Sequence, residues 1–219
     1  MSKKKKEISI PKYSLKEELI NSISHGIAAG LSIWGLVMLI IKASHNSALA
    51  VTTVTIFGTT MILLYTISCI YHALSSRVKG KKVLRVLDHC NVFLLVFGTI
   101  IPVALLGIGG IKGWICFGIV AFVTAIGIIS SATNIDKVQK LEVVCHLING
   151  WSMLIYIKVL LNNIGSIGIR LIVLGGIMYS LGAILYFVGS RKRYAHSVFH
   201  IFCILGTFSH YFAIYLYML

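Results

Sequence analysis

Acidic residues are scarce in this chain of 219 residues, which has 6 Asp and Glu against 20 Lys and Arg, so that the formal net charge is +14. Charged residues of both signs make up only 12% of the sequence, about half the proportion of a soluble domain. So few charged side chains cannot cover a water-facing surface, which excludes a soluble globular fold. Disorder is excluded as well, because 58% of the residues are apolar.

Long apolar runs dominate the remaining sequence. The hydrocarbon core of a bilayer is about 30 Å thick, so a spanning helix needs roughly 20 largely apolar residues. We therefore predict an all-α membrane protein, a seven-transmembrane helix bundle, with a basic arm over residues 1–20 and a single transmembrane domain over 21–219. The predicted spans are 21–41, 48–72, 87–107, 113–131, 143–161, 171–189 and 197–218.

The basic residues lie in short clusters between these apolar runs and predict the orientation. Sixteen of the 20 fall on one side of the predicted membrane: Lys3, Lys4, Lys5, Lys6, Lys12, Lys16, Arg77, Lys79, Lys81, Lys82, Arg85, Lys137, Lys140, Arg191, Lys192 and Arg193. Because Lys and Arg concentrate in cytoplasmic loops, we expect a cytoplasmic N-terminus and an outside C-terminus in a plasma membrane. Membrane lipids are the expected partners, and nucleic acid is not, since no basic patch lies on a polar fold.

Ionisable groups at membrane depth are costly and mark candidate functional sites. Six of the 8 histidines fall near predicted cytoplasmic helix ends: His25, His72, His89, His146, His196 and His200. Because the topology was predicted from Lys and Arg alone, this shared membrane depth is independent information. Asp88 opens the third predicted span at the same depth. The other five acidic residues are assigned to the arm or to a connection, which leaves Asp88 as the one carboxylate placed to serve a metal.

The spacing of these residues favours a metal site. His196 and His200 are four residues apart on one helix face, the arrangement by which a helix offers two nitrogen ligands to one ion. Ser68 precedes His72 by one helical turn on the second predicted span. Three histidines with a carboxylate or water would satisfy a four-coordinate Zn²⁺ and keep an open position for catalysis.

Simpler interpretations exist for each of these residues. A pair of histidines four apart can cap a helix or fill a helix seam, and His25 or His146 alone fits a hydrogen-bonded interhelical histidine. Asp88 alone could be a counter-ion for Arg85 or an acid that suits a helix N-terminus. The 5 cysteines, an odd number within or beside apolar spans, do not predict a disulfide framework, and Cys203 is only a weak candidate ligand.

Ordered motifs on several predicted helices resemble those of the hemolysin III family, the bacterial branch of the progestin and adipoQ receptor group that includes the adiponectin receptors. The motifs are Glu18-x-x-Asn21 with Ser24-His25-Gly26, Ser68-x-x-Tyr71-His72, Asp88-His89 with Gly98-Thr99 and Pro102, and His196-x-x-x-His200 with Gly206 and His210. The chain departs from the family at Ile100 and Ile101, where the family usually has Tyr and Thr. Two hydroxyls are thereby lost from the bundle interior, but none of the proposed ligands is affected.

The resemblance implies a bundle inverted relative to G-protein-coupled receptors, with a Zn²⁺ site near the cytoplasmic face. It implies that His72, His196 and His200 bind the metal, that Asp88 holds a water bound to it, and that Ser68 lies beside it. The residues expected around these are His25, His89, His146 and Tyr71. The wider group includes alkaline ceramidases, which use such a set for amide hydrolysis in membrane lipids, and the bacterial branch is associated with hemolysis and membrane-lipid homeostasis.

Three functions remain open from the sequence. The first is a zinc-dependent hydrolase of lipid amides or esters, with Asp88 and Ser68 as catalytic residues and a substrate from the inner leaflet. The second is a regulator or receptor whose zinc stabilises the bundle without catalysis. The third is a pore-forming hemolysin or channel, which the concentration of polar residues in the cytoplasmic third disfavours. The oligomeric state is not assigned.

Overall fold

The computed structural model describes residues 8–189 and 192–219, and the predicted basic residues Lys3 to Lys6 and Arg191 lie outside this part of the chain. The described residues are mostly helical. In chain order the elements are α1 (Leu15–Ala43), α2 (Ala48–Ala73), α3 (Gly80–Pro102), η1 (Val103–Ile108), α4 (Gly110–Asn134), α5 (Gln139–Ser152), η2 (Met153–Tyr156), α6 (Ile157–Gly189) and α7 (Ala195–Tyr217).

Serine caps define where the first two helices begin. The Ser14 side chain accepts a hydrogen bond from the backbone N–H of Glu17, and the Glu17 carboxylate accepts one from the Ser14 backbone N–H, which together form a capping box. Ser47 caps α2 through the backbone N–H of Ala50. Helix α1 therefore begins at Leu15, six residues before the first predicted span.

Helix α3 also begins earlier than predicted, at Gly80 instead of residue 87. Lys81 and Arg85 were predicted to lie in a connection between spans, but their side chains are only 1% and 10% exposed. Lys81 donates to Glu18 and Arg85 donates to Asp136, each over 2.6 Å. Because both cations have carboxylate partners, the helix can continue through them without leaving a buried charge unpaired.

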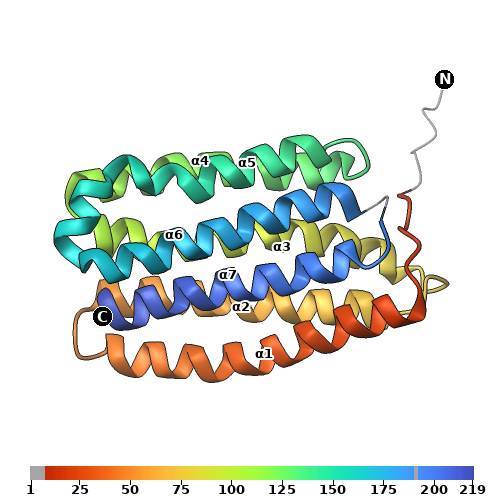
Figure 1. Cartoon of the computed structure of the whole chain (residues 1–219), viewed down its shortest axis with the longest axis horizontal. Coiled ribbons are helices and arrows are strands. Elements are labelled where there is room, and N and C mark those ends of the chain that lie inside the picture. Colours follow the sequence, from red (N-terminus) through yellow and green to blue (C-terminus); the bar gives the residue numbers. More distant parts are fainter. Residues whose placement is uncertain (1–7, 190–191) are drawn as a thin grey trace.

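Glycines in the left-handed region break the helices at the end of the bundle where α7 finishes. Gly109 (φ 69°) separates η1 from α4, and Gly165 (φ 71°) interrupts α6. Such φ values are strained for residues with a Cβ atom. After Gly165 the chain runs back alongside α5 (Figure 1).

Six helical segments of the described residues are long and apolar enough to cross a membrane. The predicted fifth and sixth spans both fall within one of them, the 49-residue segment Gln139–Phe187 that contains the break at Gly165. The count of seven spans is therefore not confirmed by length and composition. The prediction of an all-helical, multi-pass membrane protein is confirmed.

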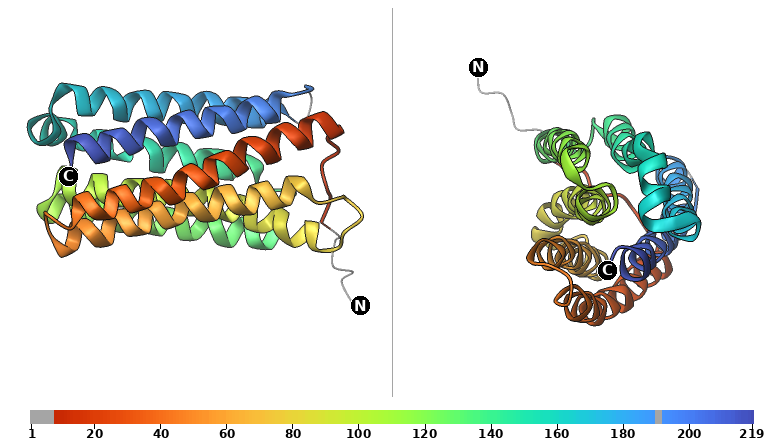
Figure 2. Two further views of the ribbon diagram at one scale, coloured as in Figure 1. Left: turned by 90° about the horizontal axis from the view of Figure 1, so that it is seen from below. Right: turned by 90° about the vertical axis from the view of Figure 1, so that its left-hand side faces the viewer.

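The helices form a ring when viewed along the bundle (Figure 2, right). Helix α7 packs against α6 and α1, and α2 packs against α1 and α3, so that the first and last helices are neighbours. Large apolar side chains such as Trp34 (63% exposed) and Phe122 (68%) cover the outside, as expected of a surface that faces lipid. The start of α1 and the end of α7 lie at opposite ends of the bundle (Figure 1).

Candidate metal centre

The predicted ligands His72, His196 and His200 come together at the end of the bundle where α1 begins. One ring nitrogen from each lies within 4.8 Å of the others. His72 ends α2, whereas the other two lie in the first turns of α7. All three are nearly removed from solvent, at 2%, 9% and 1% exposed.

The hydrogen bonds of His72 leave one of its nitrogens free to bind a metal. Its Nδ1 lies 2.6 Å from Glu18 Oε2, and because a carboxylate only accepts, Nδ1–H is the donor. With the single proton of a neutral imidazole on Nδ1, Nε2 carries the lone pair. Nε2 is buried and has no hydrogen-bond partner among the described residues. A carboxylate behind a ligand histidine is the usual way in which proteins fix its tautomer and orientation.

The two α7 histidines face each other through their Nε2 atoms, which are 3.0 Å apart. Two nitrogens on a tetrahedral zinc, each at 2.0–2.1 Å, would be about 3.3 Å apart, so the pair needs little movement to fit. A direct hydrogen bond between two imidazoles would also explain this distance. It would not explain the unpartnered Nε2 of His72, and the three donors together could hold a metal ion.

Asp88 and Ser68 lie beside the three histidines. Asp88 is 8% exposed and interacts with Ser68 of α2 and electrostatically with His72. The Ser68 hydroxyl is 1% exposed and makes no hydrogen bond of normal geometry within the described residues. Asp88 is not the counter-ion of Arg85, whose guanidinium instead donates to Asp136 and to the Ser9 carbonyl. A carboxylate and a hydroxyl without strong protein partners are therefore available to a ligand at this site.

Two of the four residues expected around the site contact the ligands. The ring of His25 stacks on His200, with centroids 3.9 Å apart, and neither of its nitrogens has a hydrogen-bond partner in the described chain. This differs from the hydrogen-bonded interhelical histidine considered for His25. Tyr71 packs its ring edge-on against His72 at 4.7 Å.

The other two, His89 and His146, belong to a separate polar group around Glu142 of α5. His89 Nδ1 lies 3.2 Å from Glu142 Oε2, which also accepts a hydrogen bond from Tyr186. The other oxygen, Oε1, accepts a hydrogen bond from the Ser131 hydroxyl. The ring of His146 stacks on Phe93 of α3 at 3.9 Å.

The assignment of Glu17, Glu18 and Glu142 to the arm or a connection was wrong, because all three lie in helices. Asp136 does lie in a connection, and Glu7 is outside the described residues. Glu142 is 3% exposed inside the bundle, and Glu18 reaches His72 from α1. Glu18, Asn21 and His25 are spaced to share one helix face, a signal in the sequence that would have placed Glu18 beside the metal site. Tyr13 is a further omission, since its ring stacks on His196 at 4.8 Å.

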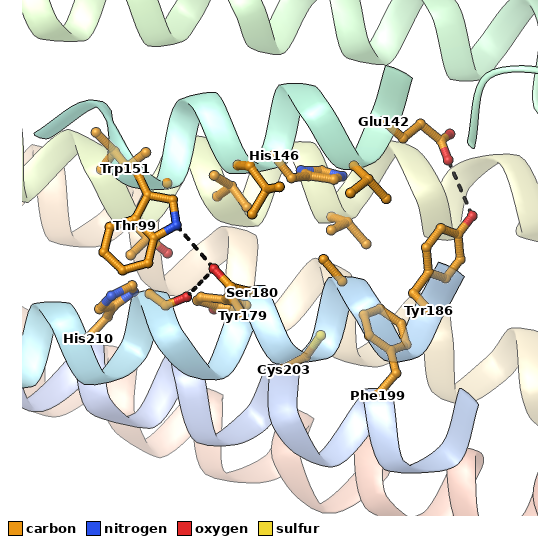
Figure 3. Close-up of a pocket in the computed structure, with 18 of the residues that line it drawn as sticks. Thr99, Glu142, His146, Trp151, Tyr179, Ser180, Tyr186, Phe199, Cys203 and His210 are labelled. Atoms are coloured by element: carbon orange, nitrogen blue, oxygen red, sulfur yellow. Dashed lines mark hydrogen bonds between the residues drawn. The ribbon is translucent and has the colours of Figure 1, made fainter. Parts of the chain in front are cut away.

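A mostly apolar cavity of about 90 Å³ lies between α3, α5, α6 and α7 (Figure 3). Glu142 and Tyr186 line one end, Trp151, Ser180 and His210 line the other, and His146 lies between them. Phe199 forms part of its wall and packs against both ligand histidines of α7, with centroids 5.4 and 5.5 Å away. Phe199 thus contacts both the cavity and the two predicted ligand histidines of α7.

Comparison with known proteins agrees with the motifs. A model of the family described as "Haemolysin-III related" matches residues 13–211. The protein "Hemolysin-3" of Bacillus cereus is 36% identical over 206 residues, which cover 94% of this chain and 93% of that protein. "Hemolysin-3 homolog" of Bacillus subtilis (strain 168) is 34% identical over 209 residues, which cover 94% and 96%. The predicted resemblance is thereby confirmed.

Proposed function

The chain belongs to the haemolysin-III related family, and from this premise we propose that it is a zinc-dependent hydrolase of membrane-lipid amides or esters. The observation that carries the proposal is the group of three buried histidines with ligand nitrogens within 4.8 Å, beside Asp88 and Ser68. Three imidazoles with one open position are the donor set of catalytic zinc sites. When bound, zinc would lower the pKa of a water at that position to about 7 and polarise a carbonyl.

We place the site at the cytoplasmic face of a seven-span bundle. The opposite positions of the start of α1 and the end of α7 agree with an odd number of crossings (Figure 1). The break at Gly165 supports two crossings within the segment Gln139–Phe187. The basic residues then hold the end that carries the histidines in the cytoplasm of a bacterial cell.

Asp88 and Ser68 would carry the protein's part of the chemistry. The carboxylate of Asp88 accepts a proton from the attacking water and then passes it to the leaving nitrogen or oxygen. The free hydroxyl of Ser68 donates a hydrogen bond to the substrate carbonyl, which gains negative charge as the water adds. Glu18 holds the His72 ring in place throughout.

The apolar cavity supports a lipid as the substrate. Its wall of Phe199 and Cys203 lies on α7, the helix that carries two of the ligands, so an acyl chain in the cavity would end beside the histidines. A cavity of about 90 Å³ is several times the roughly 10–15 Å³ that a single water needs, and it would take part of an acyl chain whose remainder stays in the inner leaflet.

The proposal is tested first by metal analysis of the purified protein. Wild type should hold one zinc per chain, and the His196→Ala/His200→Ala variant should hold none. Next, release of fatty acid from lipid amides and esters in vesicles should require zinc and should stop in Asp88→Ala, with circular dichroism unchanged. Turnover by metal-stripped Asp88→Ala protein would refute the hydrolase.

Two other functions have a specific observation behind them. The histidines join α2 to α7, so zinc could serve a receptor or regulator by stabilising the bundle. In that case chelation lowers the melting temperature and no lipid is hydrolysed. The name of the Bacillus cereus relative points to cytolysis, by a pore or channel. Release of a dye from vesicles by the purified chain tests this directly.

A further inference from the structure

A short extended segment crosses the end of the bundle at which the histidines lie. It comprises residues 8–14, called the cover below, and leads into α1 (Figures 1 and 2, left). The capping box of Ser14 and Glu17 fixes its end at α1. Glu17 also accepts a hydrogen bond of 2.8 Å from the backbone N–H of Tyr194, just before α7.

The other end of the cover is fastened to the connection between α4 and α5. Ser9 donates to the Asp136 carboxylate from both its backbone N–H (3.2 Å) and its hydroxyl (2.7 Å). Arg85 of α3 donates to the same carboxylate over 2.6 Å and to the Ser9 carbonyl over 2.7 Å. One charged pair therefore holds the backbone of the cover through several hydrogen bonds.

Between these two attachments Tyr13 lies on the metal centre. Its ring stacks on His196, with centroids 4.8 Å apart and planes at 17°, and is tilted against His72 at 5.8 Å. Phe199 packs against His196 as well, at 5.4 Å. The histidine at the margin of the site is thus enclosed by aromatic rings, one of them supplied by the cover.

An open cavity of about 510 Å³ lies beside the cover. It is bounded by the cover, Glu17, Gln139, Tyr186, His196 and the connection before α7, where Lys192 and Arg193 are exposed. These exposed cations lie at the edge of the cavity. Tyr13 and His196 both line it, and the stacked tyrosine ring covers one face of this histidine, which is 9% exposed.

We propose that residues 8–14 are a latched cover of the metal centre, in which Tyr13 is a positioning residue that shields His196 and must move before metal or water exchanges through this end. The interaction of Ser9, Arg85 and Asp136 is the latch. This inference rests on the metal binding proposed above. It assigns a role to a segment outside the helices that hold the ligands.

The experiment measures how fast zinc leaves the full-length protein in detergent when excess chelator is added. Replacing the ring by Tyr13→Ala should speed the loss of zinc roughly three- to tenfold, the range set by one aromatic stacking contact. Tyr13→Phe keeps the ring and should release zinc at the wild-type rate. Tyr217→Ala removes a half-buried tyrosine from the opposite end of the bundle and is the matched control.

The latch is tested by Asp136→Asn, which should also speed zinc loss while the equilibrium zinc content stays at the wild-type value. The proposed cover would be overturned if wild type and Tyr13→Ala lost zinc at the same rate. It would also be overturned if Tyr217→Ala accelerated the loss of zinc as much as Tyr13→Ala does. A wild-type protein without zinc would instead overturn the metal site. In that case carbethoxylation of His196, followed by peptide mass, reports the shielding without any metal, and Tyr13→Ala must raise its rate for the cover to stand.

Discussion

Replacing Glu18 by glutamine separates two roles that this carboxylate has in the structure. Its Oε2 accepts from His72 Nδ1 and its Oε1 from the ammonium of Lys81, both over 2.6 Å. Loss of a carboxylate behind a metal-ligating histidine usually lowers metal affinity about 10- to 100-fold, or roughly 1.4–2.8 kcal/mol. We expect the dissociation constant of zinc for Glu18→Gln, measured by competition with a chelator, to rise by that factor.

The same substitution leaves the Lys81 charge without its counter-ion. Lys81 is 1% exposed, and removing one partner of such a buried pair costs about 3–5 kcal/mol. The Glu18 side chain is itself 19% exposed, so water can partly replace it and the lower end of that range applies. Glu18→Gln should therefore lower the melting temperature even without metal.

The double variant Glu18→Gln/Lys81→Met distinguishes the two effects. It removes the unpaired charge, so stability should return toward wild type while the zinc affinity stays low. Glu17→Gln is the matched control, because Glu17 contacts the Ser14 cap and the Tyr194 backbone and not His72. Zinc affinity of wild-type strength in Glu18→Gln would refute the reasoning about His72.

Three further predictions follow from the structure. Asp88→Asn should bind zinc at wild-type stoichiometry yet lose lipid hydrolysis. If wild type and Asp88→Asn hydrolysed lipid at the same rate, Asp88 would not be a catalytic residue. Burial opposes ionisation of Asp136, but hydrogen bonds from Arg85 and the cover lower the pKa of this carboxyl below its usual value. The ion pair of Asp136 with Arg85 therefore stabilises the folded protein at pH values above that usual pKa. This stabilisation is lost as the pH falls through the lowered pKa. The difference in melting temperature between wild type and Asp136→Asn should accordingly be constant near neutral pH and vanish in acid. Gly98→Ala should destabilise by about 1–3 kcal/mol, because its Cβ would lie 2.2 Å from Thr60 Oγ1, and Gly98→Ala/Thr60→Ala should recover part of the loss in thermal melting.

The ligand histidines could be predicted from the sequence because their spacing is local. His196 and His200 must share a helix face at any position in a bundle, and His72 is one turn beyond Ser68 in an apolar run. That these elements meet required the motifs of the family, since spacing on one helix says nothing about its neighbours. The structure brings all three within 4.8 Å.

Tyr13 could not be recognised by the same route, and Glu18 was overlooked although its spacing places it on one helix face with His25. Both lie close to a run of lysines, where an acidic or aromatic residue is expected to face water. The capping box at Ser14 starts α1 at Leu15, and this early start carries Glu18 into the bundle. Lys81 illustrates the same limit. It was predicted to be a charge in a connection, but it is buried because its ammonium pairs with the Glu18 carboxylate from another helix.

The metal centre also constrains how the protein is made. His72 is synthesised long before His196 and His200, and Glu18 and Tyr13 come from the start of the chain. Only after the last helix has entered the membrane beside α1 do these residues meet, so a ribosome-bound chain that ends before α7 has one of the three ligands. Acquisition of the metal would therefore mark a chain in which both α2 and α7 are inserted, and failure to insert either helix would leave the centre without its full set of histidines.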